Sequence, residues 1–402
     1  MHCEFPLDEG FYYVGGSDRR LALFENIYPL ENGASFNSYL FLDEKTVLLD
    51  TVDEAVTKVF FENLEFLLAG RPLDYLIVDH MEPDHAASIG DLLLRYPNVT
   101  IVTSQMASMF LKNFFPNLKC NVQVVKEGDT LNTGKRTFRF IAASMVHWPE
   151  VIMTYEETTK TLFSADAFGT FGALSGNVVE CGCKFVKKHL AEARRYYANI
   201  VGKYGVQVTG VLKKAATLDI ARIAPLHGPV YEGHLDEIIN VYAKWAAYEP
   251  EDKDGVLIVY GSIYGGTANA AEVLARELAL RNVKNIALYD VSKTDSSVLV
   301  GEAFRVGTIL LLSSTYNLGV FQKMEDYLHD LANHLIKNRT FGIVENGSWS
   351  PAAAKCMHAI LDPLPGNKFL EKTFTIRSVA KEEQLADLKE LADQALATLT
   401  LE

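Results

Sequence analysis

In the last third of the chain, short apolar runs alternate with longer amphipathic stretches. The apolar runs predict buried strands at residues 256–260, 286–289, 308–313 and 341–344. The amphipathic stretches predict helices at residues 268–281, 320–334 and 382–399. Strands that alternate with helices in this way are typical of a parallel sheet covered by helices on both faces, a doubly wound α/β fold.

The first 250 residues show a different pattern, with strand-like runs close together. Runs at 11–14, 38–42 and 46–50 have the spacing of adjacent antiparallel strands. A helical stretch at 52–69 follows, and more strands are predicted at 73–78, 99–103, 122–125, 138–141 and 161–163. We expect mixed sheets with helices outside them. The charged segment 248–255, which contains Pro and Gly, separates the two patterns, so we predict domains at 1–250 and 251–402.

Charge and hydropathy exclude several kinds of partner. The 402 residues contain 38 Lys and Arg against 51 Asp and Glu, a net charge of −13 without a basic block, which argues against nucleic acid and anionic membranes as partners. The longest apolar run, 306–312, is far shorter than the ~20 residues that span a bilayer. The N-terminus lacks the layout of a secretory signal. We therefore expect a cytoplasmic protein with no membrane segment.

The cysteines are few and scattered. Because their number is odd and the chain is long enough for a large core, we expect no disulfide framework. We expect Cys181 and Cys183 to be ordinary small buried residues, with a redox or regulatory role as the alternative. No Cys-x-x-Cys pair occurs, which excludes a rubredoxin-like or iron–sulfur centre. The five are Cys3, Cys120, Cys181, Cys183 and Cys356.

Potential metal ligands cluster after the strand predicted at 73–78. The sequence His-x-Glu-x-Asp-His at 80–85 lies in a turn before a helical stretch at 86–95. Such crowding also occurs on loops without a metal, so the cluster alone leaves both interpretations open. Three further candidates each follow an apolar segment and precede Gly or Pro: His147, Asp166 and His227. Together the set offers imidazoles and carboxylates only, which suits iron better than structural zinc, and its size requires two metals.

Three loops of the C-terminal part point to a flavin. Strand 256–260 runs into a Gly- and hydroxyl-rich loop that lacks the Lys of a Walker loop and the Gly-x-Gly-x-x-Gly of a dinucleotide fold. Neutral donors of this kind match the monophosphate of FMN. Two more loops follow the third and fourth strands, where Tyr316 and Trp349 would flank an isoalloxazine ring. The candidate FMN residues are Ser262, Ile263, Tyr264, Gly265, Gly266, Thr267, Thr315, Tyr316, Asn317, Gly319, Asn346, Gly347, Ser348 and Trp349.

The order His-x-Glu-x-Asp-His, His147, Asp166, His227 resembles the metallo-β-lactamase-like domain of flavodiiron proteins, and the three loops resemble the flavodoxin-like domain of the same family. The resemblance covers nearly the whole chain. It implies an N-terminal αββα sandwich followed by a doubly wound parallel sheet. It also implies the roles of the ligands: one iron on His80, Glu82 and His147, the other on Asp84 and His227, and Asp166 bridging them. His85 would stand just outside the metals or bind weakly, and Trp148, Tyr196 and Tyr197 would belong to the aromatic surroundings.

The resemblance further implies reduction of O2 to water, of NO to N2O, or both, with FMN feeding electrons to the diiron site. It implies a head-to-tail homodimer or a dimer of dimers. Without a Cys-x-x-Cys module the electrons would come from a separate donor such as rubredoxin. Two alternatives stay open: a dinuclear zinc hydrolase of the same fold, and a non-enzymatic flavin electron carrier or gas sensor. Metal analysis with a visible spectrum discriminates among them.

Overall fold

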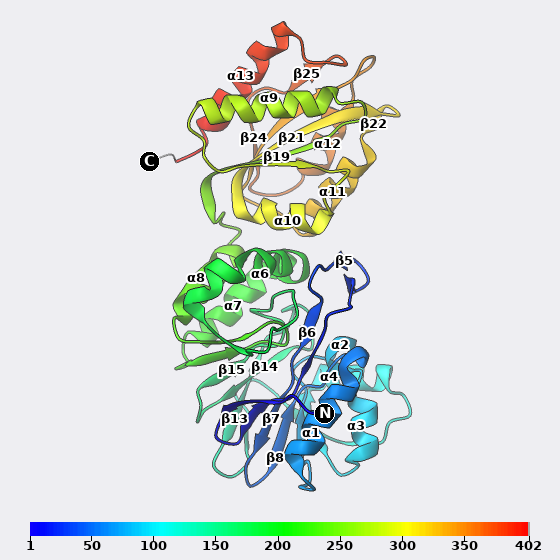
Figure 1. Cartoon of the computed structure of the whole chain (residues 1–402), viewed down its shortest axis with the longest axis vertical. Helices are drawn as coiled ribbons and strands as arrows, with labels where there is room; N and C mark the ends of the chain where they lie inside the picture. Colours follow the sequence, from blue (N-terminus) through cyan, green and yellow to red (C-terminus); the bar gives the residue numbers. More distant parts are fainter. Residues whose placement is uncertain (401–402) are drawn as a thin grey trace. The chain divides into compact units, whose positions relative to one another are not determined.

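The computed structural model describes residues 1–400 and contains two compact units (Figure 1). The first comprises Met1–Tyr197 and Tyr204–Ala243, and the second comprises Ala198–Lys203 together with the chain from Lys244 onward. Within the described residues, no helix combines the length and the apolar character needed to cross a membrane.

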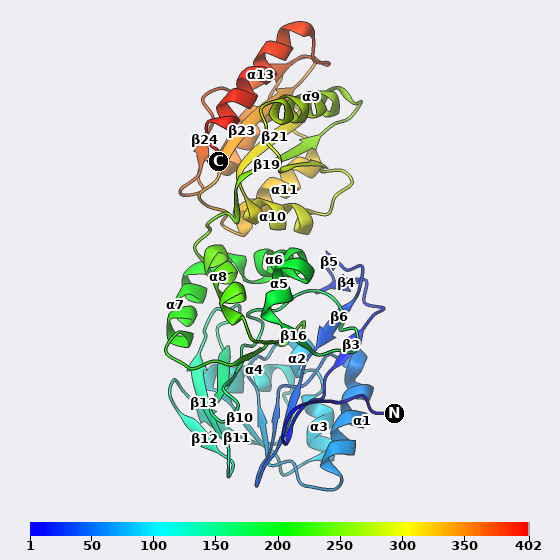
Figure 2. The same ribbon diagram turned by 60° about the vertical axis from the view of Figure 1, so that its left-hand side comes forward.

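Two seven-stranded sheets form the centre of the first unit (Figure 2). The first sheet is antiparallel from its first to its fourth strand and parallel from the fourth to the seventh. Its order is β1 (Phe5–Asp8), β2 (Phe11–Tyr13), β7 (Tyr39–Leu42), β8 (Thr46–Leu49), β9 (Tyr75–Ile77), β10 (Thr100–Ser104) and β11 (Asn121–Val125). The second has the order β12 (Thr130–Asn132), β13 (Thr137–Ala142), β14 (Ile152–Glu156), β15 (Thr161–Phe163), β17 (Arg222–Ala224), β18 (Val230–Glu232) and β16 (Val179–Cys181).

The facing sides of the two sheets form the core. Phe41 of the first sheet packs edge-on against Phe138 and Phe163 of the second, with ring centroids 5.1 and 5.8 Å apart. All three rings are buried, and such aromatic pairs stabilise the sheet contact beyond their burial alone. Helices cover the outer faces: α1 (Thr57–Leu68), α3 (Ile89–Arg95) and α4 (Gln105–Phe114) on the first sheet, and α7 (Gly205–Ala215) and α8 (Leu235–Ala246) on the second. The predicted αββα sandwich is confirmed.

Short elements connect these layers. A two-stranded sheet pairs β3 (Gly16–Asp18) with β6 (Ala34–Phe36), and β4 (Leu23–Phe24) forms a hairpin with β5 (Tyr28–Pro29). The helix expected at 86–95 is instead two helices, because Ala87 and Ser88 separate α2 (Pro83–Ala86) from α3. The remaining elements are α5 (Phe185–Lys188), α6 (Leu190–Tyr196), 3₁₀ turns at Glu54–Val56, Gly182–Lys184 and Gly202–Tyr204, and a π turn at Tyr197–Val201.

The second unit is built on a parallel sheet. Its order is β20 (Ile286–Asp290), β19 (Asp252–Gly261), β21 (Val306–Tyr316), β23 (Thr340–Asn346) and β24 (Lys368–Phe369); β25 (Phe374–Ile376) also pairs with β23, and β22 (Gly319–Val320) with β21. Helices α9 (Gly266–Leu280) and α13 (Glu382–Leu396) cover one face, and α10 (Ser296–Arg305), α11 (Gln322–Asn333) and α12 (Ala353–Leu361) the other (Figure 2). The predicted doubly wound sheet is confirmed.

In this sheet the second strand along the chain, β20, lies outside the first, β19. The chain therefore leaves β19 toward one face of the sheet. It leaves β21, the strand on the other side of β19, toward the opposite face. The loops that follow these two strands therefore diverge at the carboxyl ends of the strands, the usual ligand position in doubly wound sheets.

A buried arginine holds the base of the second unit together. Arg339, 1% exposed, donates from Nε to Ala303 O at 2.7 Å and from Nη2 to Phe304 O at 3.0 Å. Its Nη1 donates to Tyr248 O at 2.7 Å. The carbonyls of the last turn of a helix have no partner within that helix, so Arg339 satisfies two such groups at the end of α10.

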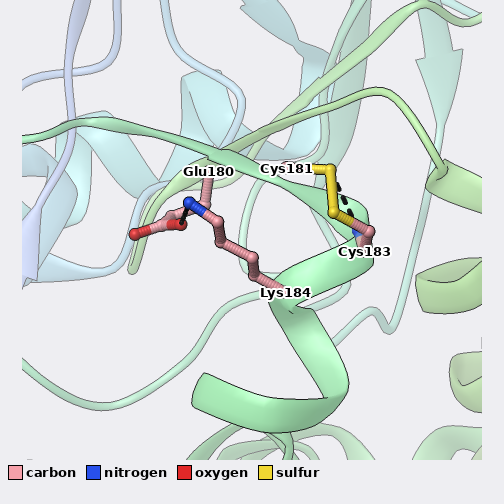
Figure 3. Close-up of a disulfide and its surroundings, with 4 residues drawn as sticks. All are labelled: Glu180, Cys181, Cys183 and Lys184. Carbon is pink, nitrogen blue, oxygen red and sulfur yellow. Dashed lines mark hydrogen bonds and ion pairs between the residues drawn. A yellow bond between two sulfur atoms is a disulfide. The ribbon is translucent and has the colours of Figure 1, made fainter.

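The expectation for Cys181 and Cys183 is wrong. The two residues are joined by a disulfide (Figure 3), Cys181 is half-buried, and Cys183 is exposed. They lie where the chain leaves β16, the last strand of its sheet, so consecutive side chains there reach the surface rather than the core. Gly182 between them has its backbone so close to Gly233 O and His234 O that a Cβ would lie 2.6 and 2.4 Å from them.

Candidate functional site

All the predicted metal ligands lie in the first unit, in segments that follow its strands. His80 and Glu82 lie between β9 and α2, and Asp84 and His85 form part of α2, in which Pro83 occupies the first position. Proline is suited to that position because its fixed φ fits the helix and its missing N–H would have no helical partner. His147 lies between β13 and β14, Asp166 follows β15, and His227 lies between β17 and β18. The structure brings these seven side chains into two neighbouring groups.

The first group consists of His80, Glu82, His147 and Asp166. Glu82 Oε2 lies 3.1 Å from Nε2 of His80 and 3.1 Å from Nε2 of His147. Asp166 Oδ2 lies 3.1 Å from His147 Nε2 and 3.5 Å from His80 Nε2. Two imidazole nitrogens and two carboxylate oxygens therefore converge on one point.

The second group consists of Asp84, His85 and His227. Asp84 Oδ2 lies 3.2 Å from His227 Nε2 and 3.3 Å from His85 Nε2. The other oxygen of Asp166, Oδ1, lies 3.2 Å from His85 Nε2 and 3.7 Å from His227 Nε2. Each oxygen of the Asp166 carboxylate thus faces a different group. His85, expected outside the metals or weakly bound, has its Nε2 as close to these oxygens as His227 does.

Hydrogen bonds on the far side of two imidazoles fix their orientation. His80 Nδ1 donates to Glu150 Oε1 at 2.8 Å, and His227 Nδ1 donates to Ser35 O at 2.7 Å. With Nδ1 protonated in this way, Nε2 of each ring is left as the atom that faces the carboxylates. Metal-binding histidines characteristically make such a bond to a carboxylate or a backbone carbonyl.

Sequence reasoning missed two buried carboxylates that hold this arrangement. Glu150 Oε1 also accepts from Met81 N at 3.0 Å, so one oxygen supports both the His80 ring and the backbone that follows it. Asp50 Oδ1 accepts from the backbone N–H groups of Asp79 and His80 at 2.9 and 3.2 Å. The position of Glu150, just after His147-Trp148-Pro149, was the available signal. For Asp50 the only signal was an acid at the end of a predicted strand.

The mutual proximity of acids and imidazoles shifts their proton affinities. Burial lowers the pKa of His147, but its hydrogen bonds to Asp166 and Glu82 raise it more, to about 9. Burial also lowers the pKa of His227, but the adjacent Asp84 carboxylate and the charge of Asp166 raise it more, to about 9. For Glu82, burial raises the pKa, whereas hydrogen bonds from His147 and His80 bring it well below its usual value.

The donor atoms fit a pair of metal ions. Among the described residues, several buried atoms of the two groups have no hydrogen-bond partner: Asp84 Oδ1, Asp166 Oδ1, both ring nitrogens of His85, and His227 Nε2. Buried polar atoms are nearly always hydrogen-bonded, so a bound ion would satisfy all of these atoms except His85 Nδ1, because the His85 ring faces the carboxylates through Nε2. The set contains nitrogen and oxygen donors without thiolate, which suits iron.

Aromatic rings surround both groups. The Trp148 ring centroid is 5.4 Å from that of His80, and the Tyr196 and Phe24 rings lie 5.6 and 5.1 Å from that of His227. The predicted Tyr197 packs on Tyr242, with centroids 4.8 Å apart. Of the two tyrosines expected around the metals, Tyr196 lies beside His227, whereas Tyr197 packs on Tyr242.

The three predicted flavin loops meet at the carboxyl ends of β19, β21 and β23. Thr267 lies in the first turn of α9. Its hydroxyl oxygen is 2.9 Å from Ser314 Oγ and accepts a hydrogen bond from Asn346 Nδ2 at 3.1 Å. These bonds connect one residue from each loop. Asn346 also accepts from Ser378 N at 3.0 Å. A fourth segment, around Ser378, therefore takes part, which the sequence did not indicate.

The start of α9 has the form of a phosphate cradle. Gly265 has φ +91°, which favours glycine, and caps α9 without a side-chain hydrogen bond, so the first N–H groups of a 15-residue helix are left for a ligand. A Cβ at Gly266 would lie 2.0 Å from Ser378 O. Around this cradle three aromatic side chains are exposed: Tyr264 by 98%, Trp349 by 70% and Tyr316 by 50%. Exposed rings beside an open helix terminus suit a planar ligand with a phosphate.

Comparison with known proteins identifies this combination of units. The family described as ODP family beta lactamase matches residues 34–228. An uncharacterized protein of Methanocaldococcus jannaschii is 31% identical over 383 residues, 94% of each chain. Among solved structures, the flavodiiron protein from Giardia intestinalis has a TM-score of 0.90 at 25% identity, covering 98% of this chain and 97% of the other. The chain belongs to the flavodiiron protein family.

Two further similarities within the flavodiiron proteins cover both units. A nitric oxide reductase of Moorella thermoacetica is 28% identical over 99% of this chain and 100% of its own length. The rubredoxin oxygen:oxidoreductase from Desulfovibrio gigas superposes with a TM-score of 0.92 at 26% identity, covering 99% of this chain and 100% of the other. The resemblance noted from the ligand order is therefore confirmed over the length of the chain.

Proposed function

We propose that this flavodiiron protein reduces O2 to water, NO to N2O, or both, at a site for two iron ions, with FMN as the source of electrons. The observation that carries the proposal is the Asp166 carboxylate, whose two oxygens face two separate groups of buried imidazoles and carboxylates. We assign the diiron site to a domain of residues 1–250 and the FMN site to a domain of residues 251–402.

The ligand assignment follows the two groups. His80, Glu82 and His147 would hold one iron, Asp84 and His227 the other, and Asp166 would bridge them. The contacts of His85 with Asp84 and Asp166 favour a place for His85 on the second iron. Two reduced irons held next to each other would supply electrons and adjacent coordination positions to a diatomic gas.

The protein's own residues prepare this site in two ways. Three carboxylates offset much of the charge of two iron ions, and Glu150 and Ser35 keep the imidazole Nε2 atoms turned toward the metals. The rings of Trp148, Tyr196 and Phe24 pack against two of the proposed imidazole ligands and give the sides of the site an apolar lining. An apolar lining of this kind suits small uncharged gases.

For the flavin we propose that the N–H groups at the start of α9, with the hydroxyls of Ser262 and Thr267, bind the FMN phosphate. The aromatic side chains of Tyr264, Tyr316 and Trp349 would contact the isoalloxazine ring. The other predicted FMN residues belong to the same three loops and would complete the site. They are Ile263, Gly265, Gly266, Thr315, Asn317, Gly319, Asn346, Gly347 and Ser348.

We further propose that electrons come from a separate redox protein such as rubredoxin. The similarity to the rubredoxin oxygen:oxidoreductase from Desulfovibrio gigas supports this donor. We propose a head-to-tail homodimer, or a dimer of such dimers, in which the FMN of one subunit serves the diiron site of the other. We also propose that the protein is cytoplasmic and binds neither nucleic acid nor membranes. The net charge of −13 supports the absence of these two partners, because both are anionic.

The test is metal and flavin analysis of the purified protein, followed by anaerobic assays of O2 and NO consumption by the reduced enzyme. We expect about two irons and one FMN for each chain, and consumption of at least one gas. Asp166→Ala and His147→Ala should lose gas reduction and keep the flavin, whereas the exposed control Glu157→Gln should keep both. Zinc without flavin would favour a dinuclear hydrolase and refute the proposal, as would flavin and iron without gas consumption.

A further inference from the structure

The disulfide between Cys181 and Cys183 lies outside the diiron and flavin sites. Cys181 ends β16, Gly182 starts a 3₁₀ turn, and the chain continues from Cys183 into α5 and α6 (Figure 3). Cys183 is exposed and Cys181 is half-buried, so an attacking group from solvent reaches Cys183 first.

This disulfide contributes little as a structural crosslink. The stabilisation that a disulfide gives by constraining the unfolded chain grows with the loop that it closes. Here the two cysteines are separated by one residue, so the closed loop is minimal. The register of β16 is set by other contacts: its pairing with β18 and the bond from Gly182 N to Gly233 O at 3.0 Å. The bond therefore contributes little to the stability of the fold.

The surroundings of Cys181 stabilise a negatively charged sulfur. Its Sγ accepts a hydrogen bond from Cys183 N at 3.3 Å, in the place of a helix N-cap. The neighbouring Lys184 and Lys188 are paired with the buried Glu180 rather than with the sulfur. A hydrogen bond from a backbone N–H to sulfur favours thiolate over thiol. The bond from Cys183 N therefore makes Cys181 the better leaving group when the disulfide is attacked.

We propose that Cys181 and Cys183 form a thiol–disulfide exchange site that reacts with dithiols, either small molecules or the Cys pair of a redox protein. A thiolate of the dithiol attacks Cys183 Sγ, a new S–S bond forms, and Cys181 leaves as a thiolate. The second thiol of the dithiol then attacks the dithiol sulfur that is bonded to Cys183. The dithiol closes to a disulfide, and Cys183 is released as a thiolate that takes up a proton. Two electrons and two protons pass from the dithiol, which becomes a disulfide, to the protein, whose two cysteines become thiols.

This site lies on elements that also carry parts of the candidate metal centre. β16 pairs with β18, which begins three residues after His227, and the helical segment that starts at Gly182 continues to Tyr196. None of the proposed iron ligands takes part in the exchange. The inference therefore stands independently of the activity proposed above.

The experiment is thiol counting after reduction of the folded protein with dithiothreitol. The variant Cys3→Ser/Cys120→Ser/Cys356→Ser keeps only the pair; after acid quenching, free thiols are tagged in denaturant and counted by mass spectrometry. We expect no tags before reduction, two after it, and none again after treatment with oxidised dithiothreitol. If this variant does not fold, the wild type is used instead. Its three free cysteines are then tagged before reduction, and all five cysteines are tagged after it.

Two results would overturn the proposal. If reduction requires denaturant to be present with the dithiothreitol, the disulfide is a closed structural bond. If two tags appear in every sample, oxidised ones included, the pair does not form the bond. The attacked sulfur is tested by trapping with glutathione, a monothiol: we expect the adduct on Cys183, and an adduct on Cys181 contradicts the proposed direction. Cys181→Ser, as the matched control, should leave one tag under all dithiothreitol conditions.

Discussion

Replacing Glu150 with Gln tests whether the carboxylate behind His80 controls iron binding. Glu150 and His80 are both fully buried, and Glu150 Oε1 accepts from His80 Nδ1 at 2.8 Å and from Met81 N at 3.0 Å. Gln keeps an oxygen of the same size in the same place but removes its charge. A hydrogen bond to a charged acceptor contributes about 1 kcal/mol more than one to a neutral acceptor. Two such bonds amount to about 2 kcal/mol, of which the His80 bond acts directly on the metal ligand.

We therefore expect iron at the His80 group to bind about 5- to 30-fold more weakly, at 1.4 kcal/mol for each factor of ten. This lies near the usual range for loss of a group that orients a metal ligand. The assay is anaerobic competition for ferrous iron between the metal-free protein and a chelator of known affinity. Glu157→Gln, which removes an exposed carboxylate paired with Arg139, is the control and should bind iron as the wild type does. Wild-type affinity in Glu150→Gln would refute the reasoning.

Three other predictions concern protons, flavin and stability. In the metal-free protein His147 and His227, with pKa values of about 9, carry protons at pH 7. Because ferrous iron must displace these protons, the affinity for iron should rise from roughly pH 7 to 9. Titration of the unbuffered protein with iron should acidify the solution. A pH-independent affinity would contradict this. Trp349→Ala should weaken FMN binding about tenfold, measured by flavin fluorescence, with iron content unchanged; equal affinity would remove Trp349 from the flavin site. Arg339→Met leaves three buried carbonyls without their donor and should destabilise the second unit by about 2–4 kcal/mol in urea unfolding, whereas a loss below about 1 kcal/mol would count against it.

Much of the metal site could be predicted because its ligands are carried by sequence-local signals. His80, Glu82 and Asp84 lie in one turn, and each of the more distant ligands stands at the end of an apolar run, where a strand ends. Their order along the chain therefore predicted which side chains would meet. The division into two groups came from the resemblance to the flavodiiron proteins and not from a local signal, because Glu82 and Asp84 lie in one turn and yet face different groups.

What the sequence could not provide was the support behind the ligands and the state of the cysteines. Asp50 and Glu150 act through hydrogen bonds to backbone and imidazole groups of distant segments, and nothing local distinguishes such a buried acid from one on the surface. Short strands such as β16 and β18 leave too few residues for a periodic pattern. Without β16, the edge position that exposes Cys183 was not visible either.

The carboxylate of Asp166 is a physical link between the two metal positions. A metal held by one of its oxygens would keep the other oxygen in place, so the second metal would bind to a carboxylate that is already oriented. Uptake of iron should therefore be cooperative, with half-filled molecules scarce. Under iron shortage, a population of this protein would divide into fully competent and wholly inactive molecules, and its output would scale with the number of competent molecules.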